Sequence, residues 1–540
     1  MTVYTQLPWR YTPRLSVLVG PSEIARVLQL KTPAVVTNWR ARSTDFPAER
    51  VGGSQPKFDL IEVYEWLRDK GPRTSALPQV SPSAWWRLLV DGFQRQANVE
   101  APRSTMIALL LLRHVLGDDP LLQTEGPRQW ELIAESRPNS PTPSSGAENI
   151  DSVARTFSSV AKWAERKNPE LAGLLVEPLT LDPETAAYLC DVVDALEANP
   201  KISTQERLGA VRRVSIDART KQPVRATVDR MVEFMVAVAC PKPRQVVLDP
   251  AAGEANLLIG LGRTGEGMRL LGQEIDIATW RIARSCVLIE QLDADLGQPG
   301  RDSFREDQHP QAHADLVVVD PPLGDDAPPL ERWIEYGLAH LAPTGRLVIV
   351  LPLHEIVPVR AARRKPDLRL VKMIQALVSS RAVEGVVVVP RGERSDLIGP
   401  VAILSVVHGS TTAQPPAGPD AAAASVTLVA VQHRDRDDPP ASIVRVLASR
   451  IRDETLAGLR SIEGDRLLVD RVDPEKFMMR LEELGILLES RAGRASLRRD
   501  QGQSPGVETT KVLGADETKV EGSALSELRT RYEKLLAEQE

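Results

Sequence analysis

Two short runs of β-branched and other apolar residues stand in the middle of the chain, at residues 246–248 and 317–319. Each is followed by an Asp-Pro pair, and the first continues through a Gly-containing turn into an apolar stretch from Asn256 to Leu261. A short apolar run bounded by turn residues predicts a buried strand, and the stretch after the turn predicts a helix. This pattern predicts an α/β domain with a parallel sheet.

The two predicted strands end in carboxylates, Asp249 and Asp320. In a parallel α/β sheet, ligands bind at the carboxyl ends of the strands. We therefore expect both carboxylates at the edge of one crevice, and such a pair indicates an enzyme site.

Four motifs follow one another in a fixed order: residues 249–255 (DPAAGEA), 270–276 (LLGQEID), 301–304 (RDSF) and 320–323 (DPPL). This order resembles the S-adenosylmethionine-dependent DNA methyltransferases of the N6-adenine type, in particular the modification subunits of type I restriction systems. The resemblance covers roughly residues 210–408. It implies a class I, Rossmann-like methyltransferase core that transfers a methyl group from S-adenosylmethionine to a flipped adenine in DNA.

The same resemblance implies further elements around these motifs. The segment from Trp280 to Leu292 is similar to the helix that follows the second strand of the family. The segment from Leu338 to Pro352 is similar to the helix, glycine turn and strand that follow the last motif.

The resemblance also assigns a set of residues to the cofactor. Gly253 lets the backbone approach the methionine part, because it has no Cβ, and Asp249 orients that part. Glu274 lies where dinucleotide folds place the acid that binds ribose hydroxyls. The alternative for each acid is an ordinary loop carboxylate at a strand end. The implied cofactor-binding residues are Asp249, Pro250, Ala251, Gly253, Glu274, Ile275 and Asp302, with Ile275 packing on the adenine and Asp302 accepting a hydrogen bond from its exocyclic amine.

The implied catalytic residues are Asp320, Pro321, Pro322 and Leu323. The Asp320 side chain and the Pro321 carbonyl are expected to accept the two hydrogens of the target amine. The two prolines keep the turn rigid, because each fixes φ. In the family an aromatic residue follows the prolines and stacks on the flipped base, whereas this chain has Leu323.

Two more departures accompany Leu323. Ala255 replaces the last glycine of the first motif and is expected to crowd the cofactor, and residues 222–227 (QPVRAT) replace the family's G-x-F/Y-T-P signature. These departures motivate an alternative function: a DNA-binding regulator built on a methyltransferase fold that has lost its activity. Methylation of protein or RNA is a third possibility, which leaves the N-terminus unexplained.

The N-terminal pattern predicts a helix from Ser22 to Leu28 and a second from Thr32 and Pro33 through Arg42, with a hairpin at residues 46–56 and a helix at 58–67. This arrangement resembles helix-turn-helix or winged-helix modules, whose second helix enters the major groove. A helical hairpin for protein contact is the alternative. The residues expected to face DNA are Lys31, Thr32, Thr37, Asn38, Arg40 and Arg42.

At 540 residues the chain is long enough for several domains. We expect the helix-turn-helix module over residues 1–72, a helical domain over 73–205, the methyltransferase domain over 206–410, an α/β or helical extension over 411–490, and a disordered linker with a terminal helix over 491–540. In the helical domain the apolar run from Met106 to Leu112 predicts a buried helix. In the extension, residues 426–431 predict an edge strand and 442–489 a helical segment.

The net charge of −6 does not indicate a protein that is basic as a whole, so any DNA contact has to come from local patches of positive charge. The three cysteines lie far apart without C-x-x-C spacing, which suggests neither a metal site nor a disulfide framework. The sequence shows no signal peptide or membrane segment, so we expect a cytoplasmic protein. A specificity or restriction subunit is the expected protein partner besides DNA.

Overall fold

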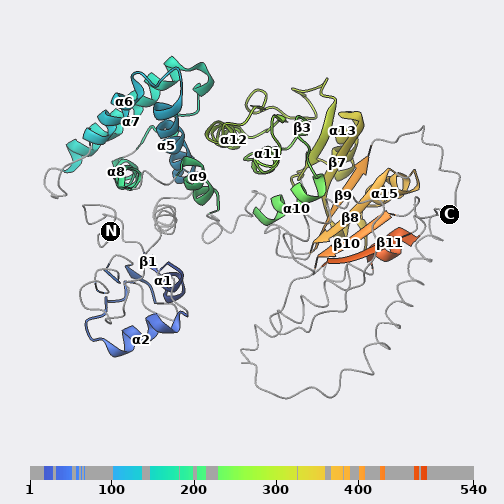
Figure 1. Ribbon diagram of the computed structural model, residues 1–540, viewed down its shortest axis with the longest axis horizontal. Coiled ribbons are helices and arrows are strands. Elements are labelled where there is room, and N and C mark those ends of the chain that lie inside the picture. Colours follow the sequence, from blue (N-terminus) through green and yellow to red (C-terminus); the bar gives the residue numbers. More distant parts are fainter. Residues whose placement is uncertain are drawn as a thin grey trace. The chain divides into compact units, whose positions relative to one another are not determined.

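Figure 1 shows the computed structural model of the chain. It describes residues 18–27, 32–50, 56–59, 62–63, 66, 101–136, 146–181, 183–198, 203–213, 229–324, 326–358, 366–380, 382–389, 400–407, 426–431, 467–472 and 476–482. The chain divides into two compact units, one of Met1–Val224 with Ala278–Leu292 and the other of Arg225–Ile277 with Asp293–Glu540.

The first unit begins with a small module of two helices and a two-stranded sheet. Helix α1 (Pro21–Val27) and helix α2 (Ala34–Arg42) confirm the two predicted helices. Pro33 occupies the N-cap position of α2, and no side chain caps this end. Strands β1 (Leu18–Val19) and β2 (Phe58–Asp59) pair antiparallel. The predicted helix at residues 58–67 is therefore wrong at its start, because Phe58 and Asp59 extend to pair with β1.

Aromatic side chains form the centre of this module. Trp66 is 6% exposed, and its ring lies 6.0 Å from that of Trp39 and 5.0 Å from that of Phe46. Phe46 also contacts Phe58 edge-on at 5.3 Å. The indole N–H of Trp66 donates to Asp45 at 3.2 Å. Both tryptophans thus belong to the aromatic cluster of this module, and large rings of this kind bury much apolar area.

The rest of the first unit is helical. The helix α5 confirms the predicted buried run, since every residue from Met106 to Leu112 is at most 1% exposed. The indole N–H of Trp130 donates to Glu197 at 2.6 Å and joins two of the helices. The elements are α5 (Ala101–Asp118), α6 (Gly126–Ser136), α7 (Gly146–Lys167), the 3-10 turn η1 (Pro169–Leu171), α8 (Pro183–Ala198), α9 (Thr204–Arg213) and α12 (Ile277–Ile289).

Helix α12 belongs to the contacts of the first unit, although it follows a strand of the second unit in the chain. Arg281 pairs with Glu177, and the side-chain amide of Gln205 donates to the Ile289 carbonyl at 3.0 Å. The predicted helix from Trp280 is confirmed, and it starts three residues earlier, at Ile277.

The second unit is built on a nine-stranded mixed sheet in the described residues, with the order β11-β10-β8-β9-β7-β6-β3-β4-β5. Its strands are β3 (Val246–Asp249), β4 (Arg269–Gly272), β5 (Ala294–Asp295), β6 (Ala314–Val319), β7 (Leu341–Pro352), β8 (Val383–Val389), β9 (Val401–Val407), β10 (Val426–Val431) and β11 (Leu467–Val472). Strands β5, β4, β3, β6 and β7 run parallel, and β9 runs antiparallel between β7 and β8.

Helices flank this sheet (Figure 1). They are α10 (Asp229–Ala239), α11 (Asn256–Gly262), α13 (Leu330–Ala339), α14 (Leu353–Ile356) and α15 (Leu368–Ser379). The core below them consists of strand residues such as Leu248, Val317 and Ile349, together with Trp333 and Ile334 of α13. The central strands are apolar on both faces, which is the expected composition for a sheet covered on both sides. The expected Rossmann-like α/β core is confirmed.

The C-terminal predictions are partly wrong. Strand β10 pairs with β8 on one side and β11 on the other, so it is not an edge strand. Strand β11 falls inside the segment predicted to be helical, where Leu467–Val472 is extended and pairs antiparallel with β10. The predicted linker and terminal helix at 491–540, and the residues at 222–227, lie outside the described residues. Among the described helices, none is long and apolar enough to cross a membrane.

Candidate active site

The site is organised around the point at which the strand order reverses. From β3 the chain continues to β4 and β5 on one side, whereas β6 and β7 lie on the other side. Strands β3 and β6 are parallel neighbours, with Val247 opposite Leu316 and Leu248 opposite Val317. Asp249 is the last residue of β3, and Asp320 follows the last residue of β6. The two predicted carboxylates therefore flank the topological switch point, where open α/β sheets bind their ligands.

The carboxyl group of Asp249 is almost completely buried, with 2% of the residue exposed. Burial raises the pKa of Asp249 to about 8, and the charges of Asp320 and Glu274 add to the rise. The backbone N–H of Ala251 donates to its Oδ1 at 3.1 Å and opposes the shift. Three acids at this end of the sheet thus share one electrostatic environment, which favours a ligand that carries positive charge.

Glu274 connects the first two sequence motifs directly. Its Oε2 accepts the backbone N–H of Gly253 at 2.9 Å, and its Oε1 accepts the backbone N–H of Asp276 at 2.8 Å. Burial raises the pKa of Glu274, and the two backbone hydrogen bonds oppose that rise. Because an ionised carboxylate offers about four lone-pair directions, both oxygens keep capacity for a hydroxyl donor.

The glycine turn is open toward solvent. Gly253 has φ of 54°, and a Cβ built there meets only the Ala251 carbonyl oxygen, at 4.0 Å. Ala255 has φ of 59°, in the left-handed region, and is completely buried at the N-cap of α11. The expectation that Ala255 crowds the cofactor is therefore not supported by its position, because its methyl group points into the protein. Its effect is on the backbone, since a left-handed conformation is unfavourable for a residue with a Cβ.

Two isoleucines stand exposed beside these carboxylates. Ile275 is 62% and Ile277 49% exposed, and they lie one and three residues after Glu274. A Cβ on Gly300 would lie 2.7 Å from Cγ1 of Ile277, so the next loop packs closely against this apolar edge. Both side chains are thus large, exposed apolar groups beside the acid of the second motif.

Asp302 lies in the loop that follows β5. Its Oδ1 accepts the N–H of Phe304 at 2.9 Å, and its carbonyl accepts the N–H groups of Arg305 and Glu306 at 3.0 and 2.8 Å. The neighbouring Ser303 hydroxyl donates to the Pro250 carbonyl at 2.6 Å. This bond joins the loop to the first motif, so the third predicted motif is brought to the same end of the sheet as Asp249.

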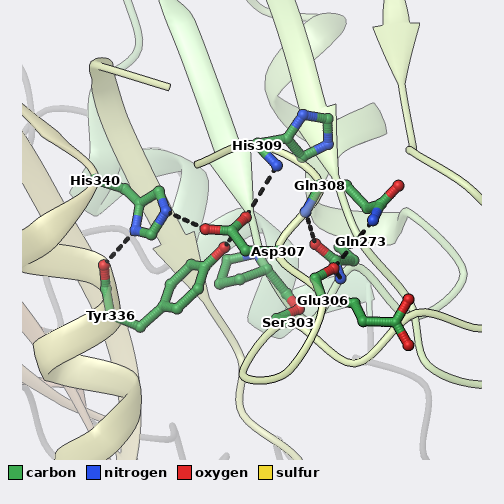
Figure 2. A network of polar contacts seen from close by, with 9 residues as sticks. Gln273, Ser303, Glu306, Asp307, Gln308, His309, Tyr336 and His340 are labelled. Carbon is green, nitrogen blue, oxygen red and sulfur yellow. Dashed lines mark hydrogen bonds and ion pairs between the residues drawn. The ribbon is translucent and has the colours of Figure 1, made fainter. Parts of the chain in front are cut away.

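Sequence reasoning missed the residues that hold this loop, which Figure 2 shows. The side chain of Gln273 is completely buried and donates to the carbonyls of Arg301 and Glu306, at 3.2 and 2.9 Å. Its Oε1 accepts the N–H of Gln308 at 3.0 Å. The ring of His309 donates to the Gly272 carbonyl at 3.0 Å. A glutamine beside a motif acid carries no signature of its own, so only the fold reveals these contacts.

A second part of the network ties the loop to α13 (Figure 2). Asp307 accepts hydrogen bonds from the Tyr336 hydroxyl and the His309 N–H, both at 2.9 Å, and pairs with Nε2 of His340 at 2.7 Å. Tyr336 and His340 stack with ring centroids 4.0 Å apart. Burial, together with the Asp307 charge, raises the pKa of the Tyr336 phenol, so it remains a donor.

The last motif leaves β6 and forms the loop before α13. Pro321 is buried, Pro322 is exposed, and Leu323 and Asp320 are half-buried. Gly324 has φ of 145°, which ends the rigid pair of prolines in a conformation suited to glycine. Asp320 and Leu323 are thus presented at the sheet edge beside Asp249, in the order that the sequence predicts.

The residues predicted to face DNA lie on the small module of the first unit. Thr32, Thr37, Asn38 and Arg42 are exposed. Arg40 is exposed as well, but it forms an ion pair with Glu49, and its guanidinium lies 5.9 Å from the Phe58 ring centroid. Lys31 lies outside the described residues.

Comparison with known proteins places this site in a family. Residues 227–392 match the family model described as N-6 DNA Methylase. This segment is an N-6 DNA methylase domain. The match spans β3, β4, β6 and β7 with both acidic strand ends, and it confirms the family resemblance expected from the motifs.

Two relatives of this methylase domain illustrate its extent. The chain is 26% identical over 132 residues to the methylase subunit of the type I restriction enzyme HindI from Haemophilus influenzae, an alignment that covers 19% of this chain and 30% of that protein. The chain thus matches less than a third of that relative's length. The methyltransferase subunit of a type I restriction-modification system from Streptococcus thermophilus is similar in structure, with a TM-score of 0.52 and 14% identity over 76% of this chain and 98% of that one. At this identity the similarity establishes the fold.

Proposed function

We propose that the chain is a DNA adenine-N6 methyltransferase that uses S-adenosylmethionine. The observation that carries this proposal is the position of Asp249 and Asp320 on either side of the switch point of an N-6 DNA methylase domain. A pair of acids at that point, with Asp249 buried and Asp320 half-buried, favours a cationic ligand beside an amine that needs hydrogen-bond acceptors.

The residues of the site fit S-adenosylmethionine by their chemistry. Asp249 suits its positive charge, and the open backbone of Gly253 suits close approach of its methionine part. Glu274 keeps acceptor capacity for the ribose hydroxyls, while Ile275 offers an exposed apolar side chain to the adenine. Asp302 supplies an acceptor for the exocyclic amine, with Pro250 and Ala251 completing the turn. When bound, the cofactor supplies an electrophilic methyl group.

The protein has to hold the target nitrogen in line with that methyl group. The lone pair of an adenine amine is delocalised into the ring, so the amine is a weak nucleophile until its geometry changes. The Asp320 carboxylate and the Pro321 carbonyl accept hydrogen bonds from the two amine hydrogens, which favours a pyramidal nitrogen whose lone pair is withdrawn from the ring and points at the methyl carbon. Pro321 and Pro322 fix the backbone of these acceptors. Preorganised polar groups of this kind contribute several kcal/mol to catalysis in other enzymes.

An adenine inside a duplex is out of reach of this site and has to be flipped out. Leu323 then contacts the base in the place where the family has an aromatic ring. The exposed face of α2, with Thr37, Asn38 and Arg42, is the proposed contact to the major groove, together with Thr32 and Lys31 just before the helix. Since the chain matches a methylase subunit, we further propose that it acts with a specificity subunit that selects the DNA site.

A methylation assay tests the activity. The purified full chain is incubated with labelled S-adenosylmethionine and DNA that lacks N6-methyladenine, with and without a candidate specificity subunit. We expect labelled N6-methyladenine from wild type. We expect Asp320→Ala to lower transfer on the order of 10²-fold or more and to leave cofactor binding largely intact. Asp326→Ala, an exposed acid six residues further along the same loop, is the matched control and should stay close to wild type.

No label on any DNA, with or without a partner, would contradict the enzyme assignment. Equal loss of transfer and of cofactor binding in Asp320→Ala would contradict the role given to this residue. Leu323 also favours a second candidate, a methyltransferase-fold regulator that binds DNA without turnover. Sequence-selective DNA binding by a protein that neither binds the cofactor nor transfers methyl groups would support that candidate instead.

A further inference from the structure

We infer that Gln273 is a positioning residue that sets how the site discriminates the adenine of its cofactor, an inference that rests on the proposed function. Gln273 lies between the last residue of β4 and Glu274, the proposed ribose ligand. Its side chain reaches the loop that carries Asp302, the proposed acceptor for the adenine amine. One residue therefore joins the two groups that contact the nucleoside.

The three hydrogen bonds of Gln273 use both N–H donors of its amide group and one acceptor site of its oxygen. Its Nε2 donates to the carbonyls of Arg301 and Glu306, and its Oε1 accepts from the Gln308 N–H. These partners lie 28, 33 and 35 residues away in sequence. Two donors and one acceptor on a side chain of this length are a property of glutamine, because glutamate lacks the donors and methionine lacks both.

The contacts fix the loop on both sides of Asp302. The Arg301 carbonyl precedes this residue directly, and the Glu306 carbonyl closes the turn in which the Asp302 carbonyl accepts two backbone N–H groups. The Ser303 hydroxyl and the His309 ring tie the same loop to Pro250 and Gly272. Since Gln273 is completely buried, its bonds are shielded from water, and an unsatisfied carbonyl there would force the loop to move.

Because the loop is held in this way, the Asp302 carboxylate stands at a fixed place relative to Glu274. A carboxylate in this position binds a ligand that donates an N–H more tightly than one that presents a carbonyl oxygen. The loss of Gln273 should therefore reduce the preference for an amine at position 6 of the purine more than it reduces binding of the rest of the cofactor.

The test measures binding of S-adenosylhomocysteine and S-inosylhomocysteine, which differ in the amine, by calorimetry on the full chain. We expect wild type to prefer the adenosyl ligand by about tenfold or more, the contribution of a hydrogen bond to a charged acceptor. Gln273→Met keeps the volume and removes all three hydrogen bonds, and it should reduce this preference to about threefold or less. Gln273→Glu keeps an acceptor for Gln308 but places a buried carboxylate against the carbonyl oxygens of Arg301 and Glu306, so it should lower the preference at least as far as Gln273→Met.

Two controls separate this role from general damage. Gln245→Ala removes a glutamine that also bonds to backbone, at the opposite end of β3, and should keep the wild-type preference. Asp302→Ala should remove the preference, and adding Gln273→Met to it should change the ratio no further, since residues that act through one another are not additive.

The outcomes are distinct. Failure of wild type to bind either ligand would overturn the proposed function. Binding by wild type with an unchanged preference in Gln273→Met would overturn the positioning role alone. If neither Gln273 variant shows a cooperative unfolding transition, the residue serves the fold and the positioning role is likewise overturned.

Discussion

The backbone N–H of Gly253 donates to Oε2 of Glu274 at 2.9 Å, so the glycine turn after β3 is held by the acid after β4. The two residues belong to different motifs and are 21 positions apart in sequence. Glu274 therefore has two roles: it fixes the conformation of the glycine turn, and its remaining lone pairs can accept hydrogen bonds from a ligand. The backbone N–H groups bonded to Glu274 also oppose the rise in its pKa that burial causes.

Replacement of Glu274 by Gln should weaken both roles. The amide keeps one acceptor oxygen, so either Gly253 or Asp276 loses its partner. We expect the dissociation constant for S-adenosylmethionine to rise by about tenfold or more, since hydrogen bonds to charged groups are the stronger ones. Calorimetry measures the change. Glu254→Gln, a neighbouring acid in the same turn, is the matched control, and an equal loss in both variants would contradict the specific role of Glu274.

The raised pKa of Asp249 predicts how stability depends on pH. The group titrates near 3.8 in the unfolded chain and near 8 in the folded protein, so the folded state binds more protons between these values. Stability should therefore fall as pH rises from about 4 to about 8 and stay level above that. Asp249→Asn keeps the acceptor for Ala251 and should flatten this dependence. Thermal unfolding of both proteins across the pH range measures it, and parallel curves would argue against the shift.

The same carboxyl group links cofactor binding to protons. A cationic ligand favours the ionised form of Asp249, so binding at pH 7 should release a proton and strengthen as pH approaches 8. Calorimetry in two buffers with different ionisation enthalpies counts the protons released. Proton release that persists unchanged in Asp249→Asn would assign it to another group.

The left-handed backbone conformation of Ala255 predicts that this buried alanine can be replaced by glycine with little loss of stability. Ala255→Gly removes a methyl group worth about 0.8 kcal/mol of burial and relieves a strain of about 1–2 kcal/mol. Glycine adds about 0.5–1 kcal/mol of entropy to lose on folding. We expect a change in unfolding free energy below about 1 kcal/mol. Ala252→Gly, at a buried position without a positive φ, should lose more unfolding free energy. Denaturant unfolding measures both variants, and an equal loss of unfolding free energy would contradict backbone strain at Ala255.

Much of the sheet and the site could be predicted from the sequence because the relevant signals are local. The strand ends at Asp249 and Asp320 lie directly after apolar runs, and a parallel sheet brings such ends together without further information. The hydrogen bonds of Gln273 and the pairing of Asp307 with His340 are different. They join segments about 30 residues apart, and nothing in the residue types marks them in advance.

The errors have the same physical origin. Strand β2 at Phe58 and strand β11 at Leu467 are defined by partners far away in sequence, β1 and β10. A short apolar stretch is compatible with either a helix or a strand until its partner is known. The ion pair of Arg40 with Glu49 was equally hidden, and it changes which cation of α2 is available to DNA.

Arg42 is consequently the sharper test of the DNA-binding module. It is exposed in the last turn of α2, whereas Arg40 is engaged by Glu49 and Phe58. If Arg42 contacts a phosphate, Arg42→Ala should weaken binding by a similar factor for all DNA sequences. It should also reduce the slope of the logarithm of the binding constant against the logarithm of salt concentration by about one. Fluorescence anisotropy at several salt concentrations measures this slope. Arg155→Ala, an exposed arginine on α7, is the control, and an unchanged slope in Arg42→Ala would remove this residue from the interface.

The half-buried Leu323 separates the enzyme from the regulator. If the site receives a flipped adenine, Leu323→Phe restores a stacking surface worth roughly 1–3 kcal/mol and should raise methyl transfer by about tenfold or more. If the pocket is closed, the larger ring overpacks it and lowers stability by about 1–3 kcal/mol. Leu330→Phe, a partly buried leucine at the start of α13, is the control for overpacking alone. Transfer assays and unfolding curves on the three proteins decide between these results. A loss of stability in Leu323→Phe equal to that in the control, with no cofactor binding in any of them, would contradict the enzyme and favour the regulator.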